Sequence, residues 1–376
     1  MLSENAIAPA TSRDKYCASV DAGAIARTDT SNMGAAMNQI PFSASGEHTQ
    51  VSRLTDAFGR EITYLRLSVT DRCNFRCFYC MRGDVKFVPK AEVLSLEEMD
   101  RLCAAFFRLG VRKLRLTGGE PLLRPNIMWL VKQLGARLDQ GQFDELTMTT
   151  NGTSLSRHAV ELAAAGVRRV NVSLDSLDAR TFQQITQFDA LGSVLDGIHA
   201  ALVAGLAVRI NIVAMAGVND AEYDRLIHWC GAHGCDMALI ELMPFGNQDS
   251  GMYQALDPIQ KRLSERWTLT PSQHGTGGPC RYWHIGETGH RIGFITPMSH
   301  GFCSSCHRGR VTCTGRLVPC MAQQGDIDLR AALRCTGTDN ELEAAILAAI
   351  MHKPEGHQFN ATHGSEQGHR MWQMGG

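Results

Sequence analysis

Three closely spaced cysteines constrain this chain more than any other feature. Cys73, Cys77 and Cys80 form a C-x3-C-x2-C run on one loop between Asp71 and Gly83. A cubane iron–sulfur cluster normally takes four cysteine ligands, so three leave one iron able to bind a small molecule. Structural zinc instead closes its shell with four protein ligands, and this loop holds no histidine to complete one. The loop therefore predicts a reactive iron–sulfur cluster.

Length and charge narrow the class of protein further. The 376 residues are enough for one large α/β barrel or two domains. With 37 basic and 38 acidic residues, the chain has no net field that would draw it to nucleic acid or to an anionic membrane. No apolar run approaches the roughly 18 residues of a membrane span. We expect a soluble protein with neither nucleic acid nor membrane as a partner.

The cysteine content indicates metal sites rather than disulfides. The chain has 13 cysteines, but it is long and shows neither a secretory signal nor evenly spaced cysteine pairs. Grouped cysteines in a chain of this kind are typical of metal or catalytic sites.

Residues 1–50 differ in composition from the rest of the chain. They are rich in Ala, Ser, Thr, Asn and Gly without an apolar period, which predicts a disordered extension. An organellar transit peptide is the alternative. Such peptides avoid acidic residues, whereas this stretch contains Glu4, Asp14, Asp21, Asp29 and Glu47. We therefore expect a cytoplasmic protein.

From Arg66 onward, short β-rich runs alternate with amphipathic helical windows. The expected strands are 66–69, 113–116, 146–149, 169–173, 208–214 and 238–242, and the expected helices are 95–109, 125–138, 156–165, 193–204 and 221–233. Ser95 and Glu98 form a capping box, and Gly110, Gly166, Gly205 and Gly234 follow helices where a left-handed residue is favoured. The alternation predicts a parallel sheet with right-handed crossovers. Six units are too few for a closed eightfold barrel.

Polar and glycine residues gather where the expected strands end, the edge at which chemistry collects in such sheets. The cysteine loop follows the first strand. The later strands end in Thr117-Gly118-Gly119-Glu120-Pro121, Thr149-Thr150-Asn151-Gly152, Asn171-Val172-Ser173-Leu174-Asp175 and Glu241-Leu242-Met243-Pro244. Glycines at the second strand end would let the main chain approach a ligand closely.

A second cysteine set follows Phe245, in a region of shorter expected strands such as 281–285 and 291–295. Cys303, Cys306 and Cys320 again make three. From spacing alone, a zinc site completed by His307 or Cys313 is as good an interpretation as a second cluster.

These motifs together resemble one family. The first cysteine run is similar to the signature of the radical S-adenosylmethionine superfamily. Within it, the chain resembles the GTP 3',8-cyclases, or molybdenum-cofactor biosynthesis protein A, from about Thr55 to its last residue. The stretches that carry the resemblance are 65–77, 116–124, 169–177, the Phe-Cys-Ser-x-Cys-x-Arg-x-Arg run at 302–310, and the terminal diglycine.

The resemblance implies a fold and two metal centres. The fold is a partial, open (β/α)6 TIM-like barrel over 51–245 with a smaller α+β domain over 246–376. The cofactors are S-adenosylmethionine and two 4Fe–4S clusters, the first held by Cys73, Cys77 and Cys80 and the second by Cys303, Cys306 and Cys320. Cys313 is left out because only the spacing to Cys320 matches. The open iron of the first cluster would bind S-adenosylmethionine, and that of the second would bind the guanine of GTP.

The resemblance also implies the residues of the site. S-adenosylmethionine would contact Tyr79, Gly119, Glu120, Ser173 and Met243. GTP would contact Arg66, Arg115, Thr149, Arg209, Arg308, Gly309 and Arg310. Arg308, Arg310, Gly375 and Gly376 would have catalytic roles, with the diglycine tail reaching into the active site.

The arginines also make physical sense without the resemblance. A triphosphate carries about four negative charges and cannot enter a dry cavity unpaired, and the planar guanidinium matches phosphate oxygens well. Arg66, Arg115 and Arg209 lie in expected strands among apolar neighbours, so they need an anion if they point inward. The family often has lysine at position 209 and proline at position 82, where this chain has arginine.

The implied reaction begins molybdenum cofactor biosynthesis. A 5′-deoxyadenosyl radical removes the ribose 3′ hydrogen of GTP, and the 3′ carbon attacks guanine C8 to give 3',8-cyclo-7,8-dihydro-GTP. An external electron donor and a downstream pyranopterin-forming enzyme are the implied partners. Oligomeric state is open, with a homodimer as one option.

Two other functions are alternatives to this hypothesis. One is a radical peptide-modifying enzyme, whose auxiliary cluster is usually fully ligated. The other is a non-catalytic zinc module that recognises nucleic acid, which the near-neutral charge disfavours.

Overall fold

The computed structural model describes residues 53–81, 85–245, 250–322, 325–335, 338–356 and 371–374. The expected N-terminal extension, Arg82, Gly375 and Gly376 lie outside these ranges. Among the described residues, no helix has the length and apolar character needed to cross a lipid bilayer.

A single twelve-stranded sheet runs through the described chain, in the order β12-β11-β10-β1-β2-β3-β4-β5-β6-β9-β8-β7. The strands are β1 (Tyr64–Ser68), β2 (Lys113–Thr117), β3 (Glu145–Thr150), β4 (Val167–Ser173), β5 (Ala207–Ala214), β6 (Asp236–Glu241), β7 (Leu269–Pro271), β8 (Arg281–Ile285), β9 (Arg291–Ile295), β10 (Arg308–Val311), β11 (Arg316–Val318) and β12 (Ile327–Asp328). The order begins with β12 and ends with β7, so the sheet is open.

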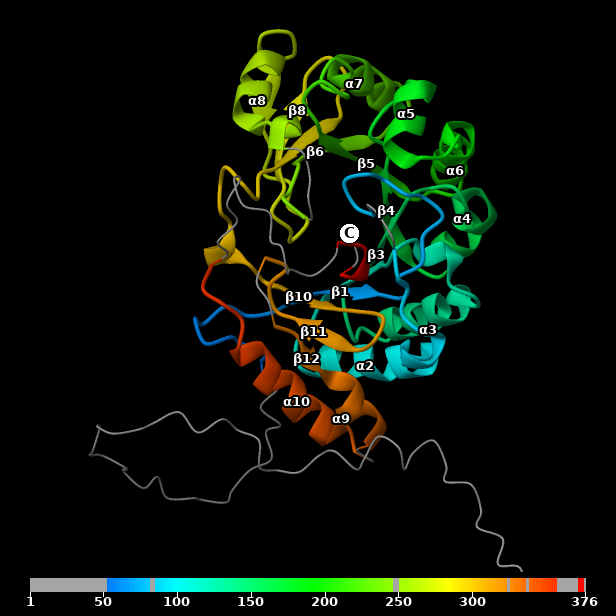
Figure 1. Ribbon diagram of the computed structural model, residues 1–376, viewed down its shortest axis with the longest axis vertical. Helices are drawn as coiled ribbons and strands as arrows, with labels where there is room; N and C mark the ends of the chain where they lie inside the picture. The colour runs from blue at the N-terminus through cyan, green and yellow to red at the C-terminus, as the bar shows by residue number, and fades with distance from the viewer. Residues whose placement is uncertain are drawn as a thin grey trace, which may run out of the picture.

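Helices cover the outer face of this curved sheet (Figure 1). They are α2 (Leu96–Arg108), α3 (Ile127–Asp139), α4 (Leu155–Ala164), α5 (Ala179–Thr186), α6 (Leu191–Val203), α7 (Tyr223–Ala232), α8 (Leu256–Ser264), α9 (Leu329–Cys335) and α10 (Asp339–Met351). Short 3-10 helices are η1 (Lys90–Glu92), η2 (Pro121–Leu123), η3 (Ser250–Met252), η4 (Cys303–Ser305) and η5 (Met371–Gln373).

The six expected β/α units are confirmed, with boundaries that differ by at most two residues. The capping box is present: the Ser95 hydroxyl accepts from the Glu98 amide at 3.1 Å, and the Ser95 amide donates to the Glu98 carboxylate at 2.7 Å. Gly110, Gly166 and Gly205 all have positive φ, as expected for residues that end helices. Helix α5 was not expected, and its N-cap Asp178 is the signal that could have revealed it.

The C-terminal segment extends the sheet at both edges of the six-strand core. Strand β10 pairs parallel to β1, and β9 pairs parallel to β6. The sheet therefore crosses residue 245, where a boundary between two domains was expected. Because β10 is parallel to β1, the Cys303 to Cys306 segment that leads into β10 lies at the amino end of these strands. The Cys73 loop follows β1 and lies at their carboxyl end.

Side chains alternate across each core strand. In β1, Leu65 and Leu67 belong to the apolar core that packs under the helices, whereas Tyr64 and Arg66 line an internal cavity. This alternation follows from the period of two in a β-strand. It gives the barrel an apolar outer layer and a polar interior.

Helix α6 approaches the end of β3 so closely that only glycine fits. A Cβ atom on Gly197 would clash with the carbonyl oxygen of Gly152, in the loop after β3, whereas one on Gly192 in the same helix would meet nothing within 4 Å. We expect Gly197→Ala to lower the free energy of unfolding by about 1–3 kcal/mol, because the backbones must separate. The matched Gly192→Ala control should be neutral or should stabilise by up to about 1 kcal/mol. Urea unfolding of the two variants measures the difference, and equal stabilities would contradict this packing.

Candidate active site

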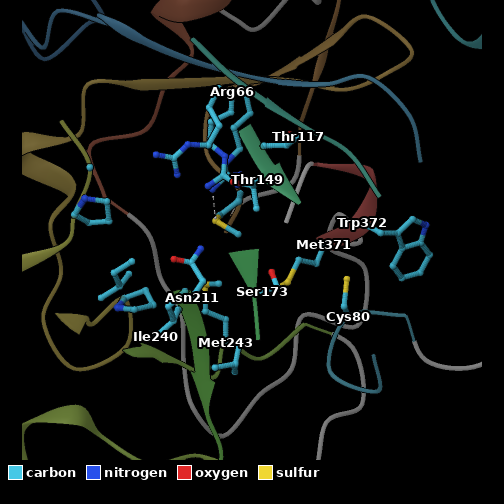
Figure 2. Close-up of a pocket in the computed structure, with 18 of the residues that line it drawn as sticks. Arg66, Cys80, Thr117, Thr149, Ser173, Asn211, Ile240, Met243, Met371 and Trp372 are labelled. Atoms are coloured by element: carbon cyan, nitrogen blue, oxygen red, sulfur yellow. Dashed lines mark hydrogen bonds between the residues drawn. The ribbon is translucent and has the colours of Figure 1, made fainter. Parts of the chain in front are cut away.

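All six predicted cysteine ligands line one cavity inside the curve of the sheet. The same cavity is lined by Tyr79, Gly119, Ser173, Met243, Arg66, Arg115, Thr149, Arg209, Arg308 and Arg310. Figure 2 shows Arg66 and Thr149 on one side of this space and Met243 on the other. Of the remaining predicted residues, Glu120 and Gly309 are not among the described residues that line it, and Gly375 and Gly376 lie outside the described chain.

The loop of the first cysteine set is held by its backbone and by aromatic packing. The amides of Arg76 and Phe78 donate to the carbonyls of Thr186 and Ile185 at 2.9 and 3.1 Å. Phe75 packs edge-on against Phe182 with ring centroids 5.8 Å apart. The loop is therefore anchored to the C-terminal end of α5, the helix that sequence patterns did not reveal.

The glycine pair after β2 packs directly on the cysteine loop. The Gly119 amide donates to the Thr70 carbonyl at 2.7 Å, and a Cβ atom on Gly119 would clash with the carbonyl of Arg72. A side chain at this position would push the cysteine loop outward. The need for glycine here thus has a local cause, in addition to any contact with a ligand.

The Glu120 carboxylate is occupied by protein donors. It accepts from the Asn151 amide at 2.6 Å, the Thr150 hydroxyl at 2.7 Å and the Leu122 amide at 3.1 Å. Burial raises its pKa to about 7, against the opposing effect of these hydrogen bonds. In this structure Glu120 ties the turn after β2 to the end of β3.

Tyr79 is fixed by a buried carboxyl group. Its hydroxyl donates to Asp175 at 2.7 Å, and the same carboxylate accepts from the Val213 amide at 2.7 Å. Burial raises the pKa of Asp175 to about 6. The aromatic ring between two predicted cluster ligands therefore has one defined orientation.

The thiols of the first set lie in a low-dielectric environment. Burial raises the pKa of Cys73 to about 11, and burial together with the nearby Cys73 raises that of Cys80 to about 12. Asn151 points its side-chain amide at the Cys73 sulfur, at 3.8 Å. Three thiols that face one cavity fit a site for a cluster, to which they would bind as thiolates after losing their protons.

Strand register brings three predicted arginines side by side. Arg66 on β1 is opposite Arg310 on β10 and Arg115 on β2. Parallel strands in register point facing residues to the same side. The three guanidinium groups therefore form an arginine row, Arg310-Arg66-Arg115, across the wall of the cavity.

The three guanidinium groups of the arginine row are buried, and their positive charges repel one another. Arg66, Arg115 and Arg310 are 9, 7 and 8% exposed. Burial lowers the pKa of Arg66 well below its usual value, and the charges of Arg310 and Arg115 add to this effect. Burial likewise lowers the pKa of Arg115 and of Arg310 to about 10. Cations packed in this way are stabilised by an anion placed among them.

Arg209 lies on β5 and is positioned by neutral partners. It donates to Asn211 at 3.0 Å and to the Tyr282 hydroxyl at 2.5 Å. Burial opposes its charge, but nearby Tyr282 and Cys280 raise its pKa above the usual value. Arg209 therefore stays fully charged in the cavity wall.

The described end of the chain reaches into the cavity. Met371 and Trp372 line it, and Figure 1 shows residues 371–374 in red within the curve of the sheet. An Arg310 guanidinium nitrogen approaches the Met374 carbonyl at 3.5 Å. The tail and the arginine row are thus neighbours.

The two residues that could complete a zinc shell at the second cysteine set are directed elsewhere. The His307 ring contacts the Glu61 carbonyl at 2.9 Å. Cys313 is 1% exposed and packs in the apolar core. Within the part of the chain that the structure describes, no three His, Cys, Asp or Glu side chains are grouped to hold a single metal ion.

Sequence patterns missed several cavity residues. Those that line it without having been singled out as ligand contacts include Tyr64, Asn211, Cys280, Phe302, Lys353 and Trp372. Strand alternation could have found Tyr64 and Asn211, since each lies two positions from a predicted arginine. Lys353 and Trp372 reach the cavity through long-range folding, which no local pattern reports.

Two known protein families match successive parts of the chain. The radical SAM superfamily matches residues 67–230, and the Molybdenum Cofactor Synthesis C family matches residues 235–359. The GTP 3',8-cyclase of Rhizobium meliloti (strain 1021) is 52% identical over 314 residues, which cover 83% of this chain and 90% of that protein. The GTP 3',8-cyclase of Paracoccus denitrificans (strain Pd 1222) is 54% identical over 311 residues, covering 82% and 90%.

Solved structures share the fold at low sequence identity. Streptococcus suis SuiB bound to its precursor peptide SuiA has a TM-score of 0.54 at 14% identity, covering 85% of this chain and 75% of that one. Native anSMEcpe with bound AdoMet has a TM-score of 0.51 at 15% identity, covering 78% and 81%. These similarities support the radical SAM fold.

Adjacent threonines on β3 give a stability test of the cavity. The Thr149 hydroxyl is buried without a hydrogen-bond partner, whereas the Thr150 hydroxyl donates to Glu120 at 2.7 Å and accepts from the Gly152 amide at 3.1 Å. In ligand-free protein, Thr149→Val should leave the free energy of unfolding within about 0.5 kcal/mol of the parent value or raise it, since no bond is lost. Thr150→Val should lower it by about 1–3 kcal/mol. Chemical denaturation compares them, and an equal loss in both variants would show that Thr149 has a protein partner.

Proposed function

Because this chain belongs to the GTP 3',8-cyclase family of radical SAM enzymes, we propose how its own residues perform that reaction. The resemblance seen in the sequence is confirmed. The protein is a radical SAM enzyme of molybdenum cofactor biosynthesis, with S-adenosylmethionine and two 4Fe–4S clusters as cofactors. The peptide-modifying alternative is not favoured, since its support is a shared fold alone.

The first site binds and orients S-adenosylmethionine. Cys73, Cys77 and Cys80 would hold the first cluster, and the Gly119 backbone, Ser173 and Met243 would contact S-adenosylmethionine beside it. Tyr79, fixed by Asp175 at 2.7 Å, forms the wall beside it. When bound, S-adenosylmethionine and its cluster supply the radical chemistry that removes a hydrogen atom from the substrate.

The arginine row binds the triphosphate of GTP. Arg310, Arg66 and Arg115 lie at one level of three adjacent strands, and their mutual repulsion is relieved by a polyanion. Arg209 and Arg308 extend the positive surface, and the Thr149 hydroxyl donates to the substrate. Gly309 would contact GTP through its backbone, since a Cβ atom there would face the apolar side chains of Ile62, Leu65 and Leu317. This assignment rests on burial, because surface arginines would not need an anion.

The second site holds the base. Cys303, Cys306 and Cys320 would hold the second cluster, which would supply the binding site for guanine. The observation that carries the whole proposal is that both trithiolate sets line one cavity, at opposite ends of β1 and β10 with the arginine row between them. A five-residue strand such as β1 spans about 16 Å, so a nucleotide bridges the two sites and presents its ribose to the first. Holding reactants in this way supplies a large part of the rate enhancement.

Arg308, Arg310, Gly375 and Gly376 are the residues to which we assign catalytic roles. The approach of the Arg310 guanidinium to the Met374 carbonyl at 3.5 Å supports a contact between this arginine and the described tail. Glycines at the tail tip would fit beside a bound nucleotide without steric conflict.

Partners and location follow from the chemistry. An external donor supplies the electron for each turnover, and a pyranopterin-forming enzyme consumes the cyclised product. A homodimer is compatible with the proposal. Thiols that ligate two clusters require a compartment that keeps cysteine reduced, which supports a cytoplasmic location.

A cysteine pair tests the second site. Under anaerobic conditions with S-adenosylmethionine, GTP and a reductant, we expect the reconstituted parent to form cyclised product and to release 5′-deoxyadenosine only when GTP is present. Cys303→Ala should reduce product formation by about 100-fold or more, because the substrate loses its anchor. Liquid chromatography with mass detection measures both products.

The control is Cys313→Ala, which removes a buried thiol that does not line the cavity and should keep product formation close to that of the parent. Parental activity in Cys303→Ala would show that the second set does not hold the substrate. Modification of a peptide without consumption of GTP would overturn the proposed function itself.

A further inference from the structure

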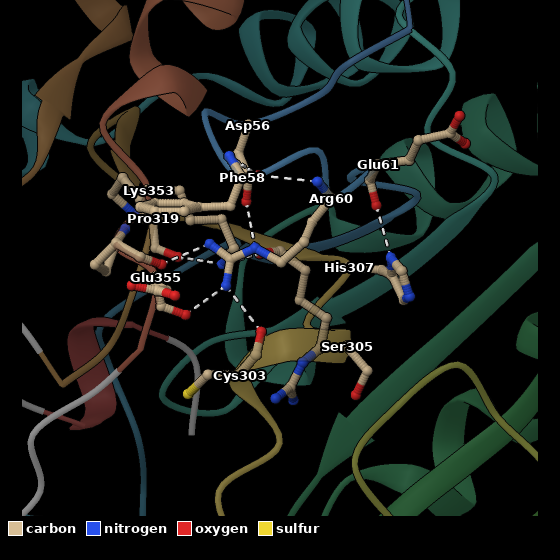
Figure 3. A network of polar contacts seen from close by, with 12 residues as sticks. Asp56, Phe58, Arg60, Glu61, Cys303, Ser305, His307, Pro319, Lys353 and Glu355 are labelled. Carbon is tan, nitrogen blue, oxygen red and sulfur yellow. Dashed lines mark hydrogen bonds and ion pairs between the residues drawn. The ribbon is translucent and has the colours of Figure 1, made fainter.

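A buried arginine outside the nucleotide site anchors one ligand of the second cysteine set. Arg60 is 7% exposed and lies in the turn before β1. Its guanidinium donates to the Cys303 carbonyl at 2.8 Å and to the carbonyls of Pro354 and Glu355 at 2.5 and 2.7 Å. Figure 3 shows this convergence of three segments that are far apart in sequence.

Asp56 neutralises Arg60 and orients it. The carboxylate accepts from Arg60 Nε at 2.6 Å and also from the amides of Phe58 and Arg60 at 2.9 and 3.0 Å. The arginine is thus a fully paired, rigid clamp. We do not assign Arg60 to nucleotide binding, because its guanidinium already donates to protein oxygens.

A buried lysine anchors the other two ligands. Lys353 is 4% exposed, and its Nζ donates to the Arg308 carbonyl at 3.0 Å and to the Pro319 carbonyl at 2.8 Å. Pro319 directly precedes Cys320, and Arg308 is two residues after Cys306. Lys353 also lines the same cavity as the Cys306 and Cys320 thiols.

The charge of Lys353 is left without an acidic partner. In the part of the chain that the structure describes, Lys353 makes no ion pair with a carboxylate, although it is almost fully buried. A buried cation without a compensating negative charge destabilises the folded protein. A cluster bound by thiolates beside it would provide the missing negative charge.

We propose that Arg60 and Lys353 are the positioning residues of the second cluster: Arg60 fixes the backbone at Cys303, while Lys353 fixes the segments of Cys306 and Cys320 and places a positive charge against the cluster. This inference rests on the proposed function, which supplies the cluster. At the first cysteine set, the Arg76 guanidinium donates to the Cys73 carbonyl at 2.7 Å, and the Cys73 sulfur faces the neutral side-chain amide of Asn151 at 3.8 Å.

The positive charge of Lys353 predicts an effect on the reduction potential of the second cluster. A nearby cation stabilises the reduced, more negative state of an iron–sulfur cluster and raises its potential. Removing the charge of Lys353 should shift the midpoint potential of the second cluster to a more negative value and leave that of the first unchanged. A purely structural role for Lys353 would not produce this selective shift.

The experiment compares reconstituted full-length variants with the parent. Lys353→Met keeps the aliphatic stem and removes the charge, Lys353→Arg restores the charge, and Arg60→Met removes the clamp. Iron per chain and redox titration followed by electron paramagnetic resonance are the readouts, and the change that S-adenosylmethionine causes in the resonance spectrum of the first cluster reports that cluster. The parent should hold about eight irons. Arg60→Met should fall toward about four irons, and its remaining cluster should still respond to S-adenosylmethionine. Lys353→Met should show the negative shift, and Lys353→Arg should reverse it.

Exposed residues provide matched controls. Lys132→Met removes a lysine that pairs with Glu161 on the outer surface, and Arg53→Met removes an arginine that pairs with Glu61. Both should match the parent in iron content and potential. Circular dichroism establishes folding first. If Lys353→Met does not fold, Lys353→Gln, which can still donate to both carbonyls, must show the shift.

The outcomes separate the two proposals. Four irons in the parent would overturn the second cluster and with it the proposed function. Eight irons in the parent, with parental iron content and potentials in the Lys353 and Arg60 variants, would overturn this inference alone. Loss of both clusters together in Arg60→Met would also overturn it, since a clamp on Cys303 acts on one site.

Discussion

The structure depends on burying several positive charges in the interior of one sheet. Arg66, Arg115 and Arg310 share one level of the cavity wall, and each is less than a tenth exposed. The acidic side chains that the described chain places along this wall are already occupied. Asp175 binds Tyr79 and the Val213 amide, and Glu241 accepts from the Ser299 hydroxyl at 2.5 Å and the Met298 amide at 2.8 Å. Buried cations that share one level of a cavity wall favour the binding of a polyanion.

The topology of the sheet places these positive charges relative to the two cysteine sets. The C-terminal segment does not stand apart from the barrel: β10 lies beside β1 and β9 beside β6. This pairing places Arg310 next to Arg66 and sets the second cysteine group at the opposite end of the strands from the first. In the proposed function, this cavity would hold the radical-generating site at one end, the base at the other, and the phosphates beside the arginine row between them.

Local patterns in the sequence carried much of the fold and the chemical identity of the site. Strand alternation, the Ser95 capping box and glycines such as Gly110 are short-range signals, and they located the β/α units to within two residues. The first cysteine set is likewise recognisable by spacing, whereas the spacing of the second set left a zinc site open until the family resemblance was considered. The remainder depends on long-range contacts. Nothing near Lys353 in sequence indicates that it lines the same cavity as Cys306, and Glu120 proved to be held by Thr150 and Asn151 rather than to line the cavity.

In the proposed function, the buried arginines bind the triphosphate of GTP and the second cluster binds its base. Contacts at both ends of the nucleotide therefore contribute to the affinity for GTP. Anaerobic calorimetric titration of the reconstituted protein with GTP, GMP and guanosine tests this most directly. We predict a stepwise loss of affinity from GTP to GMP to guanosine, and a weaker affinity for GTP as ionic strength rises. Equal affinity for GTP and guanosine would contradict the account, because the buried cations would then have no role in binding the substrate.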